Sequence, residues 1–309
     1  MRTFSLVLSL GLAALPLGAA AQTAGDGLTR LATGDDTRGW EAVGRLNFGD
    51  NSFCSGALIS EKLVLTAAHC LFDTDTGALI EPSEMQFLIG LRDGRAEAYR
   101  GVRRAVMHPD YAYGKKVELK RVAVDLALLE LDRPVRTSRV APFEVGYGPM
   151  EGEPVGVVSY AKDRSEAPSL QRECHVLEER RGVAMLSCTV DYGASGAPVF
   201  RFAADGPMIV SVVSAKADAD GQRVSLASAF GRRFDELMDA YEEGTGGGFW
   251  QGLWARDDAT DAPAYFANDN AASDQPPAGA GTPRGEMPSV RRLGTGPDGT
   301  SSAAKFLRP

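Results

Sequence analysis

Three short segments of the chain contain residues that together could perform nucleophilic catalysis. His69 lies in the segment LTAAHC, Asp125 opens DLALL, and Ser195 lies in GASGAP. A serine hydroxyl is a weak nucleophile at neutral pH, so it needs an imidazole to accept its proton and a carboxylate to hold that imidazole in the right tautomer. The chain has only three histidines, and one of them has this sequence context. His69, Asp125 and Ser195 are therefore the candidate catalytic residues.

The three segments resemble motifs of the trypsin/chymotrypsin-like serine peptidases, in the bacterial secreted type that is similar to glutamyl endopeptidases. The order His, Asp, Ser matches that fold and differs from the orders of the subtilisin and α/β-hydrolase types. The resemblance implies an all-β fold of two antiparallel six-stranded β-barrels with a C-terminal helix and the active site between the barrels. It implies a secreted serine endopeptidase that forms an acyl-enzyme on Ser195, with peptide or protein substrates and with neither cofactor nor metal.

The same resemblance assigns further roles around the nucleophile. The backbone amides of Gly193 and Ser195 should form the oxyanion hole, and a glycine suits a turn that must aim its N–H inward. Ala194 stands where activated zymogens of the family carry an aspartate that pairs with a new N-terminus. That ion pair cannot form here, so we do not expect activation by insertion of a cleaved N-terminus.

The primary substrate pocket should have an uncharged base and a cation on one wall. Lys216 could attract an acidic side chain, which favours Glu or Asp before the cut. Asp191 could instead neutralise Lys216, which would leave a preference for small apolar residues. The expected pocket residues are Thr189, Val190, Ser214, Ala215 and Lys216.

Four cysteines allow three disulfide pairings or a zinc site. Cys54 and Cys70 lie where the family has the disulfide that holds the histidine loop, and Cys174 and Cys188 flank an apparent hairpin. A zinc site is less favoured, because the chain has no C-x-x-C pair and its first residues indicate an oxidising compartment. We therefore expect the pairs Cys54–Cys70 and Cys174–Cys188.

The first 21 residues have the pattern of a secretory signal peptide. Arg2 is followed by a short apolar run and then by Ala19-Ala20-Ala21 before Gln22. The run is too short for a stable membrane span. We expect a secreted or periplasmic protein without a membrane span once the signal is removed.

Composition argues for a globular protein and against one class of partner. The 44% of hydrophobic residues is enough for a core, and the formal net charge of −8 argues against nucleic acid. Short apolar runs broken by Gly, Pro and Asp are typical of an all-β barrel or sandwich. Apolar residues at helical spacing near residue 235 predict one helix.

The expected organisation follows from these composition changes. It is a signal peptide at 1–21, a propeptide or loose arm at 22–38, a peptidase domain at 39–243 and a low-complexity, disordered tail at 244–309. Within the domain we expect the first barrel at about 39–138, the second at about 139–228 and the helix at about 229–243. The exception in the tail is Phe249-Trp250 with Leu253-Trp254, which could dock on the body or on a partner.

Two other functions are compatible with these observations. The chain could be a non-catalytic binding protein on a peptidase scaffold, or a periplasmic quality-control protease. The latter usually has a peptide-binding domain after the catalytic one, and the tail is poor in strand patterns.

His108, in a segment HPDY that resembles a turn of the family, should be a surface residue.

Overall fold

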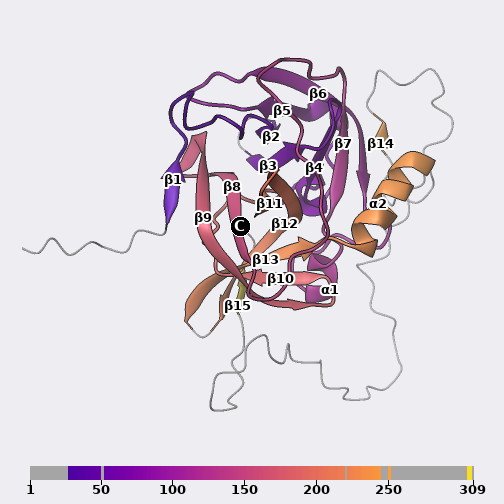
Figure 1. Cartoon of the computed structure of the whole chain (residues 1–309). Coiled ribbons are helices and arrows are strands. Elements are labelled where there is room, and N and C mark those ends of the chain that lie inside the picture. The colour runs from indigo at the N-terminus through magenta and orange to yellow at the C-terminus, as the bar shows by residue number, and fades with distance from the viewer. Residues whose placement is uncertain (1–26, 50–51, 220, 245–249, 252–304, 308–309) are drawn as a thin grey trace, which may run out of the picture.

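The short apolar runs of the sequence form the strands of two antiparallel barrels (Figure 1). The structure is a computed structural model that describes residues 27–49, 52–219, 221–244, 250–251 and 305–307. The predicted signal peptide, part of the N-terminal arm and most of the tail lie outside the described residues. Within the described residues, no helix is long and apolar enough to cross a membrane.

The first barrel closes because β6 pairs with both β5 and β7. Its strand order is β5-β2-β3-β4-β7-β6, and β6 returns to β5. The strands are β2 (Val43–Phe48), β3 (Ser52–Leu58), β4 (Leu63–Thr66), β5 (Met85–Ile89), β6 (Ala98–Met107) and β7 (Ala127–Leu131). Closure leaves few free edges for unwanted pairing.

The second barrel closes in the same way, through pairing of β8 with β9. Its order is β9-β10-β13-β12-β11-β8, and β1 (Leu28–Arg30) adds to the outside of β9. The strands are β8 (Pro154–Ala161), β9 (Arg164–Arg180), β10 (Val183–Leu186), β11 (Pro198–Ala203), β12 (Gly206–Ala219) and β13 (Gln222–Ala229). The predicted fold class, with two six-stranded barrels, is confirmed for the described part of the chain.

Helical segments lie in the loops of the barrels and after the last barrel strand. The short elements are η1 (Ala68–Leu71), η2 (Pro82–Glu84) and α1 (Leu119–Val122), and the C-terminal helix is α2 (Arg232–Glu243). Leu237 of α2 is fully buried, and Phe234 and Met238 pack against the same core. The apolar stripe of this helix is therefore core, as the helical spacing predicts.

An aromatic cluster joins the barrels and fixes their relative position. The rings of Trp40 and Phe200 have centroids 5.0 Å apart, and those of Phe143 and Phe200 are 4.7 Å apart. The buried Tyr160 of β8 donates its hydroxyl to the carbonyl of Leu91 at 2.9 Å. Edge-to-face aromatic pairs of this kind add about 0.5–1.5 kcal/mol beyond area burial. The cleft between the barrels is thus held by packed side chains from both.

Both predicted disulfides are present. Cys54–Cys70 joins β3 to η1, and Cys174–Cys188 joins β9 to the loop after β10. A closed loop of this length contributes about 3 kcal/mol in the chain-entropy model. The first bridge holds the turn that carries His69.

His108 is buried, and the prediction of a surface position is wrong. Its side chain is 1% exposed, and its Nε2 lies 3.2 Å from a carboxylate oxygen of Glu236 in α2. Its Nδ1 accepts the backbone N–H of Asp110, so in the neutral ring Nε2 carries the proton and donates it to Glu236. The turn is as the sequence predicts, but α2 packs over it.

This burial should make stability depend on pH. Burial lowers the pKa of His108, against the opposing effects of Glu236 and Asp110, and the nearby Arg233 lowers it further. Because the unfolded chain binds this proton more readily, its contribution to stability is complete above pH of about 6.5 and is lost as the pH falls below that value. The slope is at most about 1.4 kcal/mol per pH unit.

Urea unfolding at pH 7.5, 6.5 and 5.5 checks this expectation with His108→Gln as the comparison. Glutamine keeps a donor for Glu236 but does not titrate. We expect the free energy of unfolding of the wild type to fall more steeply with decreasing pH than that of the variant. Parallel curves would show that His108 does not couple to stability.

Two short strands lie within the tail for which the sequence predicts disorder. Strand β14 (Trp250–Gln251) pairs with β6, and β15 (Lys305–Leu307) pairs with β12. The pairing of β14 places the backbone of Trp250 on the first barrel. Phe249, Leu253 and Trp254, which the sequence groups with Trp250, lie outside the described residues. The rest of the tail beyond Gly244 lies outside the described residues.

Candidate active site

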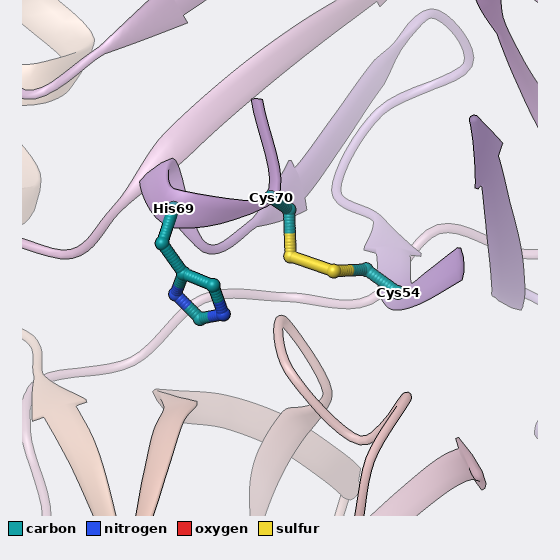
Figure 2. Close-up of side chains that lie close together, drawn as sticks. All are labelled: Cys54, His69 and Cys70. Atoms are coloured by element: carbon teal, nitrogen blue, oxygen red, sulfur yellow. A yellow bond between two sulfur atoms is a disulfide. The ribbon is translucent and has the colours of Figure 1, made fainter. Parts of the chain in front are cut away.

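His69 occupies the short turn that follows β4. It lies in η1, is 7% exposed, and is followed by Cys70, whose sulfur bonds to Cys54 (Figure 2). The strand that precedes η1 is fully buried, and η1 begins two residues after that strand ends. The imidazole is therefore fixed by a buried strand on one side and by a disulfide on the other.

Both carboxylate oxygens of Asp125 form hydrogen bonds with His69, one with the ring and one with the backbone. Its Oδ2 lies 2.6 Å from Nδ1 of His69, and its Oδ1 accepts the backbone N–H of His69 at 2.8 Å. Oδ2 also accepts the hydroxyl of Ser214 at 2.5 Å. A carboxylate with three donors fixes both the position and the rotation of the histidine ring.

The charge state of Asp125 sets the tautomer of His69. Burial alone would raise the pKa of this carboxyl, but the His69 ring and the hydrogen bonds from His69 and Ser214 more than offset burial and hold the pKa below its usual range. An ionised Asp125 can only accept, so Nδ1 of His69 carries a proton. In the neutral ring, Nε2 is then unprotonated and carries a lone pair that can accept a proton. Nε2 has no hydrogen-bond partner among the described residues.

Ser195 lies in the loop between β10 and β11, facing the same cleft as His69. Its side chain is buried, and its Oγ has no hydrogen-bond partner among the described residues. Both side chains line a cleft of about 930 Å³ that continues past the Cys54–Cys70 bridge to Phe72. The structure thus brings Ser195 and the His69–Asp125 pair together, without a hydrogen bond between Ser195 and His69.

Two glycines give the loop of Ser195 its shape. Gly193 has φ +94° and Gly196 has φ +77°, both in the region that favours glycine. A Cβ at position 193 would strike the ring of Phe53, and one at 196 would strike the Thr66 hydroxyl. The backbone N–H groups of Gly193 and Ser195 donate to no acceptor among the described residues, so both remain available.

Ser55 of β3 ties this loop to the first barrel, a role that the sequence motifs do not indicate. Its Oγ donates to the carbonyl of Gly193 at 2.9 Å and accepts the N–H of Tyr160 at 3.0 Å. Its backbone N–H donates to the carbonyl of Ser195 at 2.8 Å. A buried serine after a half-cystine looks like a core residue, so sequence alone gives no signal for these contacts.

Removal of the Ser55 hydroxyl should loosen the loop. In Ser55→Ala the Gly193 carbonyl and the Tyr160 N–H lose a buried partner, at about 1–3 kcal/mol for each unsatisfied group. We expect a lower melting temperature and about a tenfold fall in kcat, because a displacement of catalytic groups by about 1 Å can cost more than that.

Ser225→Ala is the matched control. Ser225 is a fully buried strand serine whose Oγ has no partner among the described residues. Its loss should leave kcat unchanged. Equal kcat values for the two variants, each measured at substrate saturation, would show that Ser55 does not position the loop.

The trypsin family model matches residues 33–227 of the chain. The chain belongs to the trypsin family. The match spans both barrels and includes all three candidate catalytic residues, each on an element that the family model covers.

Individual relatives match the chain over a shorter stretch than the family model does. Clotting factor C of Tachypleus tridentatus is 35% identical over 97 residues, which are 29% of this chain and 9% of that protein. The chain thus spans about a tenth of the length of this curated relative.

Solved structures share the fold of the chain. A Glu endopeptidase in complex with MPD aligns with a TM-score of 0.56 and 18% identity, over 70% of this chain and 97% of that one. A thermostable serine protease from an extremophilic microorganism aligns with a TM-score of 0.52 and 18% identity, over 65% and 96%. The trypsin-like fold and the predicted family are confirmed.

The structure gives contacts for several of the residues that the sequence predicts for the substrate pocket. Ser214 turns its hydroxyl to Asp125, at a β-bulge between Val213 and Ala215 that shifts the register of β12. Bulges next to active sites commonly re-aim a side chain in this way. Val190 is buried, and the backbone N–H of Thr189 is held by the side chain of Gln171 at 2.8 Å.

Lys216 forms an ion pair with Asp191. Its Nζ donates to Asp191 at 2.9 Å and lies 4.0 Å from the centroid of the Tyr192 ring. Burial would raise the pKa of Asp191, but the hydrogen bonds from Lys216 and from the backbone N–H of Tyr192, together with the charge of Lys216, more than offset burial and lower the pKa. The alternative in which Asp191 neutralises Lys216 is the one that the structure contains.

His69 and the two cysteines beside it have the residue types of a metal site, but both cysteine sulfurs are in a disulfide. The ligand atoms of Cys54, His69 and Cys70 lie within 4.8 Å of one another. Figure 2 shows the two cysteines joined by a bond beside the imidazole. A metal binds the thiolate form of cysteine, and neither sulfur of a disulfide is a thiolate. The group is therefore a structural bridge next to a candidate base.

Proposed function

We propose that this chain is a secreted or periplasmic serine endopeptidase that hydrolyses peptide bonds through an acyl-enzyme on Ser195. The observation that carries the proposal is the His69–Asp125 pair, bonded at 2.6 Å, in the same cleft as the unbonded hydroxyl of Ser195. Membership in the trypsin family supports peptides as the substrate class. The two disulfides and the predicted signal peptide support an oxidising compartment.

In the first half of the reaction, Ser195 attacks the carbonyl carbon of the peptide bond. Nε2 of His69 takes the hydroxyl proton as the new C–O bond forms, and Asp125 stabilises the resulting imidazolium. His69 then gives this proton to the leaving amine as the C–N bond breaks. The product is an ester between Ser195 and the acyl part of the substrate.

In the second half, water takes the place of the amine. His69 accepts a proton from the water as the water oxygen attacks the ester carbon. It returns that proton to Oγ of Ser195 as the ester C–O bond breaks and the carboxylic acid leaves. Both tetrahedral intermediates carry a negative oxygen. The free N–H groups of Gly193 and Ser195 are the groups that we assign to this oxyanion, and each such donor is worth roughly 2.7–4 kcal/mol in transition-state stabilisation.

The site should form without cleavage of an N-terminus. Ala194 is fully buried and has no charge to pair with a new α-amino group. The loop around Ser195 is held instead by the contacts of Ser55 with Gly193 and Ser195. We therefore propose that the arm before Trp40 is not an activation peptide of the insertion type.

The pocket should favour small apolar residues before the cut, since Lys216 is neutralised by Asp191. Glu endopeptidase has a similar fold, but a preference for acidic residues would need an uncompensated cation in this chain. We expect Asp191→Ala to free Lys216 and to raise kcat/KM for peptides with Glu before the cut. A partly exposed charge pair is worth about 0.2–1 kcal/mol, which corresponds to a change of about 1.4- to fivefold.

Steady-state kinetics with matched peptides that carry Ala or Glu before the cut measure this preference. The double variant Asp191→Ala with Lys216→Ala is the control, because it removes both charges. If the wild type already prefers Glu and keeps that preference in Lys216→Ala, the assignment of the pocket wall is wrong.

Mass-spectrometric mapping of cuts in a peptide library tests the proposed function. The wild type should produce internal cuts that are absent with Ser195→Ala at the same protein concentration. Cuts at the same sites and rates in both samples would come from a contaminant or from a different mechanism, and would reject the proposal.

A further inference from the structure

One edge of β12 is left open beside the active site. On one side β12 pairs with β13 along residues 211–219, whereas on the other side β11 covers it only as far as Val212. Val213 then exchanges hydrogen bonds with the loop of Ser195. Its N–H donates to the carbonyl of Ala197 at 2.9 Å, and its carbonyl accepts the N–H of Gly196 at 2.9 Å. From Ser214 onward, no strand of the second barrel covers this edge within the described residues.

An open edge of this kind can accept an added strand. Its unpaired N–H and C=O groups form a template for an extended peptide, and the main-chain bonds make such binding tolerant of sequence. This edge begins at Ser214, whose hydroxyl bonds to Asp125. A peptide that adds here therefore leads directly to the catalytic residues.

The chain places one of its own segments on this edge. Strand β15 pairs antiparallel with β12 in the register Lys216–Leu307, Ala217–Phe306 and Asp218–Lys305 (Figure 1). Since β13 occupies the opposite side of β12 at all three positions, β15 lies on the side of the Ser195 loop. The antiparallel sense means that β15 runs toward Ser214.

We propose that Lys305–Leu307 is an intramolecular occupant of the peptide-binding edge of β12 and competes there with substrate. The inference rests on the proposed function, because it takes the open edge to hold the substrate residues before the cut. A substrate strand that runs in the same sense as β15 would reach Ser214 and then Ser195. Substrate and β15 then need the same backbone groups of residues 216–218.

The size of the effect follows from the fact that β15 belongs to the same chain. A tethered segment acts at an effective concentration on the order of millimolar, and its competition raises KM by a factor of one plus the ratio of that concentration to the Kd of the segment. For this strand we expect that ratio to be about two to nine. Loss of this competitor should lower KM for a long peptide by about three- to tenfold. A small ester that does not reach residues 216–218 should be hydrolysed at an unchanged rate.

Proline substitutions in the full chain test the competition. In an antiparallel strand, only every second residue donates its N–H to a given neighbouring strand. Phe306 and Leu307 are consecutive, so either Phe306→Pro or Leu307→Pro should remove a hydrogen-bond donor to β12. Ala280→Pro is the control, because it adds a proline elsewhere in the tail. We expect one or both strand variants, but not the control, to lower KM for a peptide with five residues before the cut. Unchanged KM in both strand variants would overturn the proposal.

A binding measurement separates failure of this proposal from failure of the proposed function. A fluorescein-labelled peptide with the sequence of residues 301–309 is titrated with Ser195→Ala proteins, and fluorescence anisotropy reports binding without any hydrolysis. The chain that also lacks residues 305–309 should bind the peptide about three- to tenfold more tightly than the full-length chain. Equal affinities would contradict an occupied edge, even if the protein proved to be an active peptidase.

Discussion

Replacement of Ser195 with alanine should remove nearly all peptide hydrolysis, and His69→Ala should do the same. Loss of a single member costs on the order of 10⁴–10⁶ in rate in serine proteases, because nucleophile and base act as one unit. For the same reason the double variant should be no worse than either single one. Rates of hydrolysis of one defined peptide, measured at saturation for the three variants and the wild type, check this expectation.

The loss of activity in Ser195→Ala should occur without loss of the fold. Ser195 makes no side-chain hydrogen bond in the described part of the molecule, so its Oγ contributes little to stability. Ser195→Ala should melt within a few degrees of the wild type, and the buried Ser225→Ala should remain fully active. Multiplicative losses in the double variant would show that the two residues do not work in the same step.

Asp125→Asn should lower kcat by about 10⁴ at neutral pH. The amide cannot hold the proton of His69 on Nδ1 as the carboxylate does, so the ring can place its proton on Nε2 and lose the base that Ser195 needs. It also removes the negative charge that stabilises the imidazolium. Steady-state kinetics at pH 7 measure the loss.

Ser214→Ala should lower kcat much less than Asp125→Asn does. It removes one of the three hydrogen bonds to Asp125 and keeps the charge, so we expect a loss of only about tenfold, as for one hydrogen bond to a charged group. A loss in Asp125→Asn as small as that in Ser214→Ala would show that the carboxylate does not set the tautomer.

Features of the molecule that depend on local sequence could be predicted without the structure. The order of His69, Asp125 and Ser195 indicates the fold, because the three motifs fit one known arrangement of strands and loops. The disulfide pairs were also predictable, one from the position of Cys54 and Cys70 in the family and the other from the hairpin between Cys174 and Cys188. Apolar spacing placed α2 within a few residues.

The remaining features depend on contacts between distant segments. His108 has the sequence of an exposed turn and is buried only because α2, more than 120 residues later, packs over it. Ser55 resembles an ordinary strand serine, and Ser214 was predicted only as a pocket residue. Their contacts with Gly193 and Asp125 join distant segments that no local pattern links. The pairing of Lys216 with Asp191 was one of two open outcomes, because sequence spacing does not fix the direction of a long side chain.

The tail shows the limit of composition as a guide. Its residues are too polar on average to form a core, which predicts disorder. A strand that adds to an existing edge needs main-chain groups more than apolar side chains. Strands β14 and β15 can therefore form where composition alone gives no reason to expect them.

The most direct test of the central claim is to find which residue a fluorophosphonate labels. The hydroxyl of an activated serine displaces fluoride from phosphorus, so the adduct stays on the nucleophile and can be located by mass spectrometry of proteolytic fragments. We predict one adduct per chain, on Ser195 alone, with a labelling rate that falls at least a hundredfold (~10²) in His69→Ala, as expected when a general base is lost. No adduct, an adduct on another residue, or equal labelling rates in the wild type and His69→Ala would contradict the assignment of Ser195 and His69 as nucleophile and base.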